Sequence, residues 1–351
     1  MKSVRQSNFE LLRIVCMLMI ITGHILNYQH TDFDLDNPDY IIPKFFKGFL
    51  FVAVNSFVLI SGYWGIQFKV QKLLKLEFQI LFYSIMVFLV MTLLGFHQID
   101  FKHDFFYFLP VITKRYWFVT CYISLFLISP FLNHIKDHLS KSDYKMFLLG
   151  GFVIIYLWPT FTFLIDAPNL IEDGGYGIVN FIYLYFLGHY IHQYYRCNHS
   201  WKFYILLYLI ISSLLGVFQY IISLLLGFDF TSLFCYNTIF IFGASVSFFI
   251  AFSKMSFQSR WINYLAKSCF SVFLIHAHLL LWGNYCSYIG VNDYRGFSFL
   301  LLLAWQPITI YLVCSIIENL RLFIFGKMEN ILIEKTIKNN YHFKEILKKR
   351  I

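Results

Sequence analysis

Long apolar blocks separated by short polar links constrain this chain more than any other feature of its sequence. Blocks of roughly 18 or more mostly apolar residues are long enough to cross a hydrocarbon core of about 30 Å as helices. Such blocks occur near residues 9–27, 46–64, 76–95, 116–133, 146–165, 178–195, 203–226, 233–252, 268–288 and 298–320. The chain is 59% hydrophobic and only 13% charged. We therefore predict an all-α, polytopic membrane protein, a bundle of about ten transmembrane helices whose active machinery lies within the membrane.

Lysine and arginine are distributed unevenly between the links. One side of the predicted bundle receives Lys69, Lys72, Lys75, Lys136, Lys141, Lys145, Arg196, Lys202, Lys254, Arg260 and Lys267. The other side receives Lys102, Lys114, Arg115 and Arg295. Because short cytoplasmic loops collect positive charge, this pattern predicts that both termini are cytoplasmic.

The net charge of +9 is explained by this topology and by attraction to anionic lipid headgroups. A lipid bilayer is therefore an expected partner, and nucleic acid is not. We divide the chain into a transmembrane domain, 1–323, and a basic cytoplasmic tail, 324–351, which is expected to form an amphipathic helix on the inner membrane surface.

The first apolar block contains two ionisable side chains. It reads NFELLRIVCMLMIITGHIL, residues 8–26, and includes Arg13 and His24. The preceding Ser7 and Glu10 fit a capping box, in which the Ser7 hydroxyl accepts from the Glu10 amide and starts the helix. Arg13 and His24 are eleven residues apart (24 − 13), which at about 100° per residue is three turns with some 20° of drift. Both side chains are therefore predicted on one stripe, roughly 16 Å apart along the axis.

Either side chain alone has an ordinary explanation. Arg13 can reach the inner headgroups or pair with Glu10, and His24 can be a hydrogen-bonded packing residue near the outer interface. A charged group deep in a bilayer is costly unless it faces a cavity or a partner, so such residues mark functional sites by default. Two of them on one stripe favour a polar channel inside the bundle.

Several segments resemble the bacterial integral-membrane acyltransferases of family 3. The first helix matches the family pattern of an acidic residue, an Arg three positions on, and a His eleven residues later. Further similar segments follow in order: FVAVNSFVLISGYW (51–64), RYWFVTCYISLFLISPFLN (115–133), GGYGIVNFIYLYFLGHYI (174–191) and SCFSVFLIHAHLLL (268–281). The resemblance extends from residue 5 to about 285. Ile14 and Val15 replace the usual small residues, and the basic run after the second helix is Lys-rich.

The resemblance implies an enzyme that transfers an acyl group, typically acetyl, from a cytoplasmic donor to a hydroxyl of a cell-surface polysaccharide or its lipid-linked precursor. It implies that His24 is the general base and Arg13 positions the donor, which suits imidazole and guanidinium chemistry. Expected substrate-binding residues are Glu10, Ser61, Arg115, Tyr116, Trp117 and His276. We expect acetyl-CoA or another acyl-CoA as co-substrate, no permanently bound cofactor, no metal site, glycan-assembly proteins as further partners, and a location in the bacterial cytoplasmic membrane.

Several of these residues also have structural interpretations. Ser61 is small enough to mark a helix contact. Tyr116 and Trp117 fit an interfacial aromatic belt as well as a sugar platform, and Arg115 fits a lipid phosphate as well as an acceptor oxygen. His276 is favoured over the histidine two residues later, because the two point to opposed faces of a helix.

Two other functions fit part of the pattern. A transporter or flippase for a glycan precursor would also line a cavity with Arg, His and aromatic residues, although the internal repeats typical of transporters are not evident. A different membrane O-acyltransferase superfamily shares the reaction but would place its buried His well along the chain.

Overall fold

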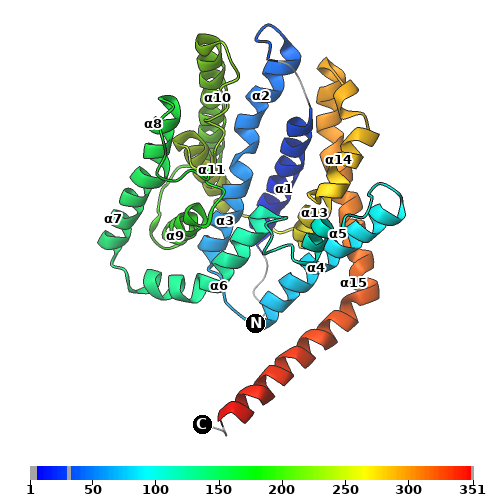
Figure 1. The fold of residues 1–351 in the computed structure, drawn as a ribbon. Coiled ribbons are helices and arrows are strands. Elements are labelled where there is room, and N and C mark those ends of the chain that lie inside the picture. The colour runs from blue at the N-terminus through cyan, green and yellow to red at the C-terminus, as the bar shows by residue number, and fades with distance from the viewer. Residues whose placement is uncertain (1–5, 30–32, 349–351) are drawn as a thin grey trace.

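The computed structural model describes residues 6–29 and 33–348, with side chains through residue 338. These residues form helices and loops without a strand, and Figure 1 shows α1 beginning and α15 ending toward the same end of the bundle. The α-helices are α1 (Ser7–Tyr28), α2 (Pro38–Leu50), α3 (Val52–Trp64), α4 (Val70–Leu93), α5 (Phe101–Asp104), α6 (Trp117–His138), α7 (Lys141–Phe152), α8 (Trp158–Leu164), α9 (Ile178–Tyr194), α10 (Trp201–Leu226), α11 (Ile239–Ser253), α12 (Arg260–Leu265), α13 (Cys269–His276), α14 (Leu279–Tyr288) and α15 (Gly296–Lys348). Short 3₁₀ or π segments are η1 (Phe105–Phe108), η2 (Val153–Leu157), η3 (Ala266–Ser268) and η4 (Val291–Asp293).

Within the described part of the chain, seven helical segments are long and apolar enough to cross a membrane. They are Ser7–Tyr28, Pro38–Trp64, Val70–Leu93, Trp117–His138, Lys141–Leu164, Trp201–Leu226 and Gly296–Lys338. A bent pair, described below, raises the number to eight when it is counted as one span, and α11 is apolar but shorter. Each of the ten predicted blocks contains helix, so the predicted polytopic all-α fold is confirmed.

The block predicted as one span over 268–288 is broken in its middle. Arg260–His276 and Leu279–Tyr288 meet at 84°. His278 lies at this break: its backbone is extended, and its side chain accepts a hydrogen bond from the Leu280 amide at 3.3 Å as the N-cap of α14. The same ring also stacks on Tyr107, with centroids 5.2 Å apart. The amides of a helix's first turn have no carbonyl acceptor within the helix, and a side-chain cap supplies one. The chain therefore changes direction here without leaving the Leu280 amide unpaired.

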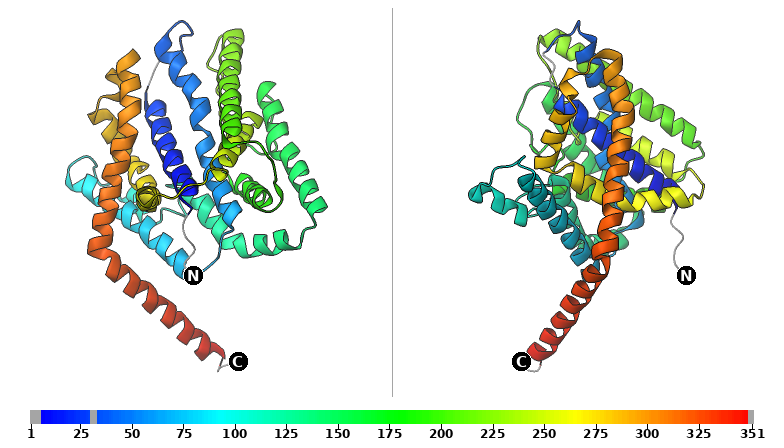
Figure 2. Two further views of the ribbon diagram at one scale, coloured as in Figure 1. Left: turned by 180° about the vertical axis from the view of Figure 1, so that it is seen from behind. Right: turned by 90° about the vertical axis from the view of Figure 1, so that its right-hand side faces the viewer.

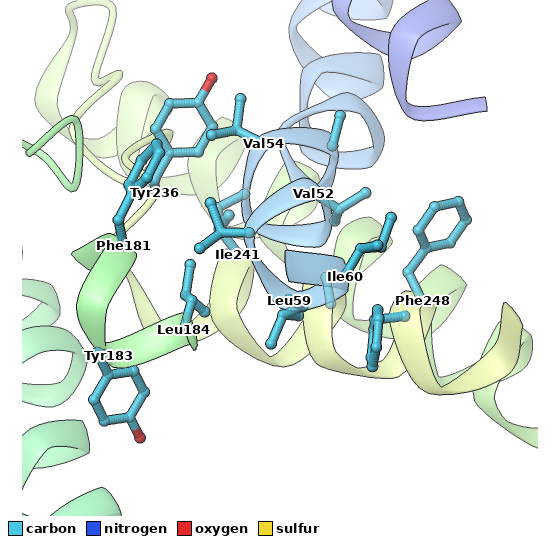
Figure 3. Close-up of a cluster of buried hydrophobic side chains, with 14 of the residues drawn as sticks. Val52, Val54, Leu59, Ile60, Phe181, Tyr183, Leu184, Tyr236, Ile241 and Phe248 are labelled. Atoms are coloured by element: carbon cyan, nitrogen blue, oxygen red, sulfur yellow. The ribbon is translucent and has the colours of Figure 1, made fainter. Parts of the chain in front are cut away.

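Two apolar cores meet along α1. The first, which we call the α3 core, surrounds α3, α9 and α11, and Figure 3 shows part of it, including Val52, Val54, Leu59, Ile60, Phe181, Leu184, Ile241 and Phe248. The second, which we call the α13 core, joins residues of α4, α13 and α15. α1 contributes Phe9 and Leu12 to the α3 core and Ile21 and Ile25 to the α13 core. The helix with the two ionisable side chains therefore runs along the boundary between the cores.

Two glycines allow α3 and α9 to approach each other closely. A Cβ atom on Gly62 would collide with the backbone of Tyr185, and a Cβ on Gly188 would collide with the backbone of Leu59. Small residues at helix contacts let backbones pack together where lipid provides no hydrophobic driving force. The α3–α9 contact therefore depends on the absence of side chains at these two positions.

The start of α1 differs from the predicted capping box. The N-cap is Gln6, with no side-chain capping bond, and the Glu10 amide donates to the Gln6 carbonyl. The Ser7 hydroxyl instead donates to Asn263 at 2.9 Å and accepts from the Ser259 amide at 2.8 Å. The prediction was wrong because partners distant in the sequence compete successfully for the hydroxyl, and the two bonds join α1 to α12 and to the residue before it.

The last helix is longer than its predicted span. α15 continues without interruption past residue 323 to Lys348 and extends beyond the bundle (Figure 2). The proposed boundary between the 1–323 domain and the 324–351 tail thus falls inside one helix. The attachment of this tail to the membrane surface stays a prediction, and its residues 349–351 lie outside the described residues.

We expect Gly62→Ala to lower the free energy of unfolding by about 1–3 kcal/mol, because the new Cβ must push α9 away from α3. Gly150→Ala is the matched control, since a Cβ at that helical position meets nothing within 4 Å. Thermal unfolding of the detergent-purified variants, followed by circular dichroism, measures both. Equal midpoints for Gly62→Ala and the unmodified chain would contradict the close-packing account.

Candidate active site

A cavity of about 470 Å³, which we call the central cavity, lies between α1, α2, α3, α6 and α13. Most of the α1 residues that line it recur every three or four residues: Glu10, Arg13, Met17, Ile20, His24 and Asn27, with Met19 and Gly23 beside them. This spacing is one face of an α-helix. Arg13 and His24 therefore face the same cavity, about 16 Å apart along the helix axis.

Arg13 lies where the central cavity meets a second one. The second cavity, about 520 Å³, is called the charged cavity because ionic side chains dominate its polar lining. The residues that line both are Arg13, Ser61, Leu76, Tyr122 and Lys267. Arg13 donates to Glu10 at 2.7 Å, and Glu10 is buried. The predicted alternative of an Arg13–Glu10 pair is thus present, yet the guanidinium still borders both cavities.

The charged cavity presents three exposed lysines. Lys72 and Lys75 come from the first turns of α4, and Lys267 comes from η3. None of the three ammonium groups forms an ion pair with a side chain in the described part of the protein. Strongly hydrated, unpaired ammonium groups around one opening create an attractive potential for anions.

A buried ionic triad forms another part of the charged-cavity wall. Arg321 contacts both carboxylate oxygens of Glu318, at 2.8 and 3.0 Å, and Glu329 at 2.8 Å. Tyr83 also donates to Glu318, at 2.5 Å. Because Arg321 is already bound by two carboxylates, the lysines, rather than Arg321, are available to an anionic ligand in this cavity.

Aromatic rings form part of the wall of the central cavity. Trp117, Tyr176 and Tyr236, which we call the aromatic cluster, lie with ring centroids 4.6 to 5.8 Å apart. Burial raises the pKa of Tyr236 well above its usual range, so the phenol stays neutral. Flat aromatic faces with nearby phenol hydroxyls provide both apolar and hydrogen-bonding contact.

His24 is half-buried between the cavity and two other rings. Its ring centroid lies 5.2 Å from that of His276 and 5.7 Å from that of Trp282. His276 is 2% exposed and does not line the central cavity. The structure thus places the His276 ring against the His24 ring, outside the cavity lining, and its role in substrate binding stays a prediction.

The other predicted site residues separate into two groups. Ser61 and Trp117 line the central cavity. Arg115 and Tyr116 do not: Arg115 donates to the His103 carbonyl at 3.0 Å and lies over the Tyr107 ring, and the buried Tyr116 hydroxyl donates to the Leu274 carbonyl at 3.0 Å. Both side chains are engaged in joining α6 to neighbouring segments.

Sequence reasoning missed several lining residues. Asn27 is three positions after His24 on the same stripe, and the helical period was a sufficient signal for it. Lys267 was considered only as a marker of topology. Tyr176 and Tyr236 lie in loops before α9 and α11, and no spacing rule connects either loop to α1.

Comparison with known proteins identifies one family. The family model described as an acyltransferase domain, of the acyltransferase 3 family, matches residues 6–317. No curated protein and no solved structure matches significantly.

We expect a cysteine at position 61 to react with a small, water-soluble methanethiosulfonate, because Ser61 borders both cavities. Ser56→Cys is the matched control on the same helix, where Ser56 is 0% exposed and donates to the Val52 carbonyl. Mass spectrometry of the proteolysed protein assigns the label to a position despite the native cysteines. Equal, negligible labelling at 61 and 56 would mean that the bundle interior is closed to water.

Proposed function

The chain belongs to the acyltransferase 3 family of multi-pass membrane acyltransferases, and we propose that it O-acetylates a polysaccharide of the bacterial cell surface or its lipid-linked precursor. The donor in this proposal is acetyl-CoA from the cytoplasm, and the membrane is the bacterial cytoplasmic membrane. One observation supports the proposal most strongly: a cation and an imidazole from one helix stripe lie at separate levels of a continuous internal space. Family membership favours acyl transfer over transport of the precursor without chemistry.

The charged cavity suits the nucleotide end of the donor. The phosphates of a CoA thioester require hydration or cations, and Lys72, Lys75 and Lys267 surround the opening. Arg13 is at the junction beyond them, where a guanidinium can bind a phosphate or an amide oxygen. The roughly 16 Å from Arg13 to His24 is comparable to the reach of an extended pantetheine arm, so the thioester would arrive near His24.

The aromatic cluster suits the acceptor. A sugar ring has apolar faces, which pack on aromatic rings, and hydroxyls at its rim, which bond phenols and amides. Trp117, Tyr176 and Tyr236 provide the rings, and Asn27 provides an amide on the His24 stripe. An acceptor that rests on this cluster would present a hydroxyl toward His24.

The chemistry requires one base. His24 removes the proton from the acceptor hydroxyl as that oxygen attacks the thioester carbonyl carbon. A C–O bond forms, the C–S bond breaks, and CoA leaves as a thiolate that receives the proton from His24. The products are the O-acetylated sugar and the free CoA thiol.

We expect His24→Ala to lower the acetyl-transfer rate by about 10²–10⁴-fold, the usual contribution of a positioned general base. The readout is incorporation of radiolabelled acetyl from acetyl-CoA into polysaccharide by membranes that contain equal amounts of each variant. His134→Ala, at an exposed histidine in the α6 end, is the control. Transfer by His24→Ala at the unmodified rate would contradict this mechanism.

We expect replacement of Lys72, Lys75 and Lys267 together by Gln to raise the KM for acetyl-CoA about tenfold or more, which corresponds to roughly 1.4 kcal/mol of lost attraction. The kcat should change little, because the cavity that the three lysines share is not lined by His24. Lys102→Gln, at an exposed lysine of α5, is the control for the loss of a lysine charge outside the cavity. Comparison with 3′-dephospho-acetyl-CoA tests whether the lysines bind the 3′-phosphate. The triple variant should have similar KM values for the two donors. If its KM values still differ as in the unmodified chain, the 3′-phosphate is recognised by other residues.

A further inference from the structure

His276 is held in one tautomer by the end of α13. Its Nδ1 atom lies 2.6 Å from the carbonyl oxygen of Val272. A carbonyl can only accept, so Nδ1 must carry the proton of the neutral ring. The other nitrogen, Nε2, is therefore a bare acceptor.

That acceptor has no partner. Nε2 of His276 is buried without a hydrogen bond to any residue in the described part of the chain. A buried acceptor left unpaired costs about 1–3 kcal/mol, and such exceptions in a native structure call for an explanation. Two rings next to His276 carry an N–H that could be its partner. Their centroids lie 5.2 Å (His24) and 5.8 Å (Trp282) from that of His276.

The His24 ring can donate the hydrogen bond that Nε2 of His276 lacks. No side-chain hydrogen bond joins its ring to a described residue, so no residue in the described part of the chain fixes its tautomer. A histidine acts best as a general base when its lone pair faces the substrate and a hydrogen bond to the opposite N–H fixes its tautomer. Apo structures often hold such pairs slightly too far apart, and the bond shortens when the substrate binds.

We propose that His276 is the positioning residue for His24, a role that rests on the acetyl-transfer function proposed above. When the substrates occupy the central cavity, Nε2 of His276 accepts the N–H of His24. The second nitrogen of His24 is then bare and faces the cavity. Trp282 packs against both rings and limits their rotation.

The proton balance is simple. His24 takes the hydroxyl proton on its cavity-facing nitrogen and becomes an imidazolium, whose other N–H remains bound to His276. When the C–S bond breaks, the cavity-facing nitrogen returns its proton to the thiolate. His276 keeps its own proton on the Val272 carbonyl throughout, so it neither gains nor loses charge.

Two substitutions separate this role from a structural one. The amide of Asn reaches the place of Nδ1, so His276→Asn can keep the bond to Val272 but has no acceptor toward His24. The longer Gln reaches the place of Nε2, so His276→Gln keeps an acceptor toward His24 and loses the Val272 bond. We expect His276→Asn to lower kcat about 10–100-fold, the range for a lost bond to a charged group, with both KM values unchanged, and His276→Gln to be faster than His276→Asn.

The outcomes distinguish the two proposals. An unmodified chain that transfers no acetyl in the polysaccharide assay rejects the proposed function. If the unmodified chain is active, the inference fails when Asn is as active as or more active than Gln, or when both lose activity equally. His278→Gln is the control for damage to the α13–α14 break, since His278 caps α14.

A measurement on the unmodified protein guards against variants that do not fold. Nitrogen-15 NMR of histidine-labelled protein with acetyl-CoA and acceptor bound distinguishes ring nitrogens that carry a proton from those that do not. The His24 signals are identified by their loss in His24→Ala. One defined His24 tautomer supports the role of His276, and an averaged mixture of two tautomers overturns it.

Discussion

An ionic group within a membrane bundle must have a partner or water, and the arrangement around α1 follows from that requirement. Arg13 pairs with the buried Glu10, and both line an internal space instead of lipid. α1 can present this polar stripe because its remaining faces are divided between two apolar cores, the α3 core and the α13 core. If one core surrounded the helix completely, the stripe would be sealed, and the guanidinium would lose any route to an incoming anion.

The parts of the fold that depend on local rules could be predicted from sequence. In lipid every backbone amide must be satisfied within its own segment, so apolar blocks become helices regardless of their neighbours. Helical period likewise placed Arg13 and His24 on one face, and both line the central cavity. Their catalytic roles remain proposals, because no position on a helix reveals which proton is transferred.

The parts that depend on distant partners could not be predicted. Ser7 looked like a cap, but its hydroxyl bonds residues about 250 positions away. From the sequence, His278 was the less favoured of two histidines that could face a cavity. In the structure it caps α14 at the point where the straight span ends. The aromatic cluster combines α6 with two loops, and such a combination becomes visible only when the chain has folded. Tertiary hydrogen bonds compete with local ones of similar strength, so local patterns are least reliable for short polar side chains.

The apolar lining of the central cavity bears on why an acyltransferase of this kind would not simply hydrolyse its donor. The apolar side chains of this lining include Met17, Ile20, Phe57 and Phe118. Apolar walls hold water weakly, and a closed site strengthens electrostatic contacts while it excludes side reactions. A pantetheine arm fills such a space better than water does, because most of its length is uncharged. In the mechanism proposed above, water is thereby kept from the thioester, and the acceptor hydroxyl is the nucleophile that His24 activates.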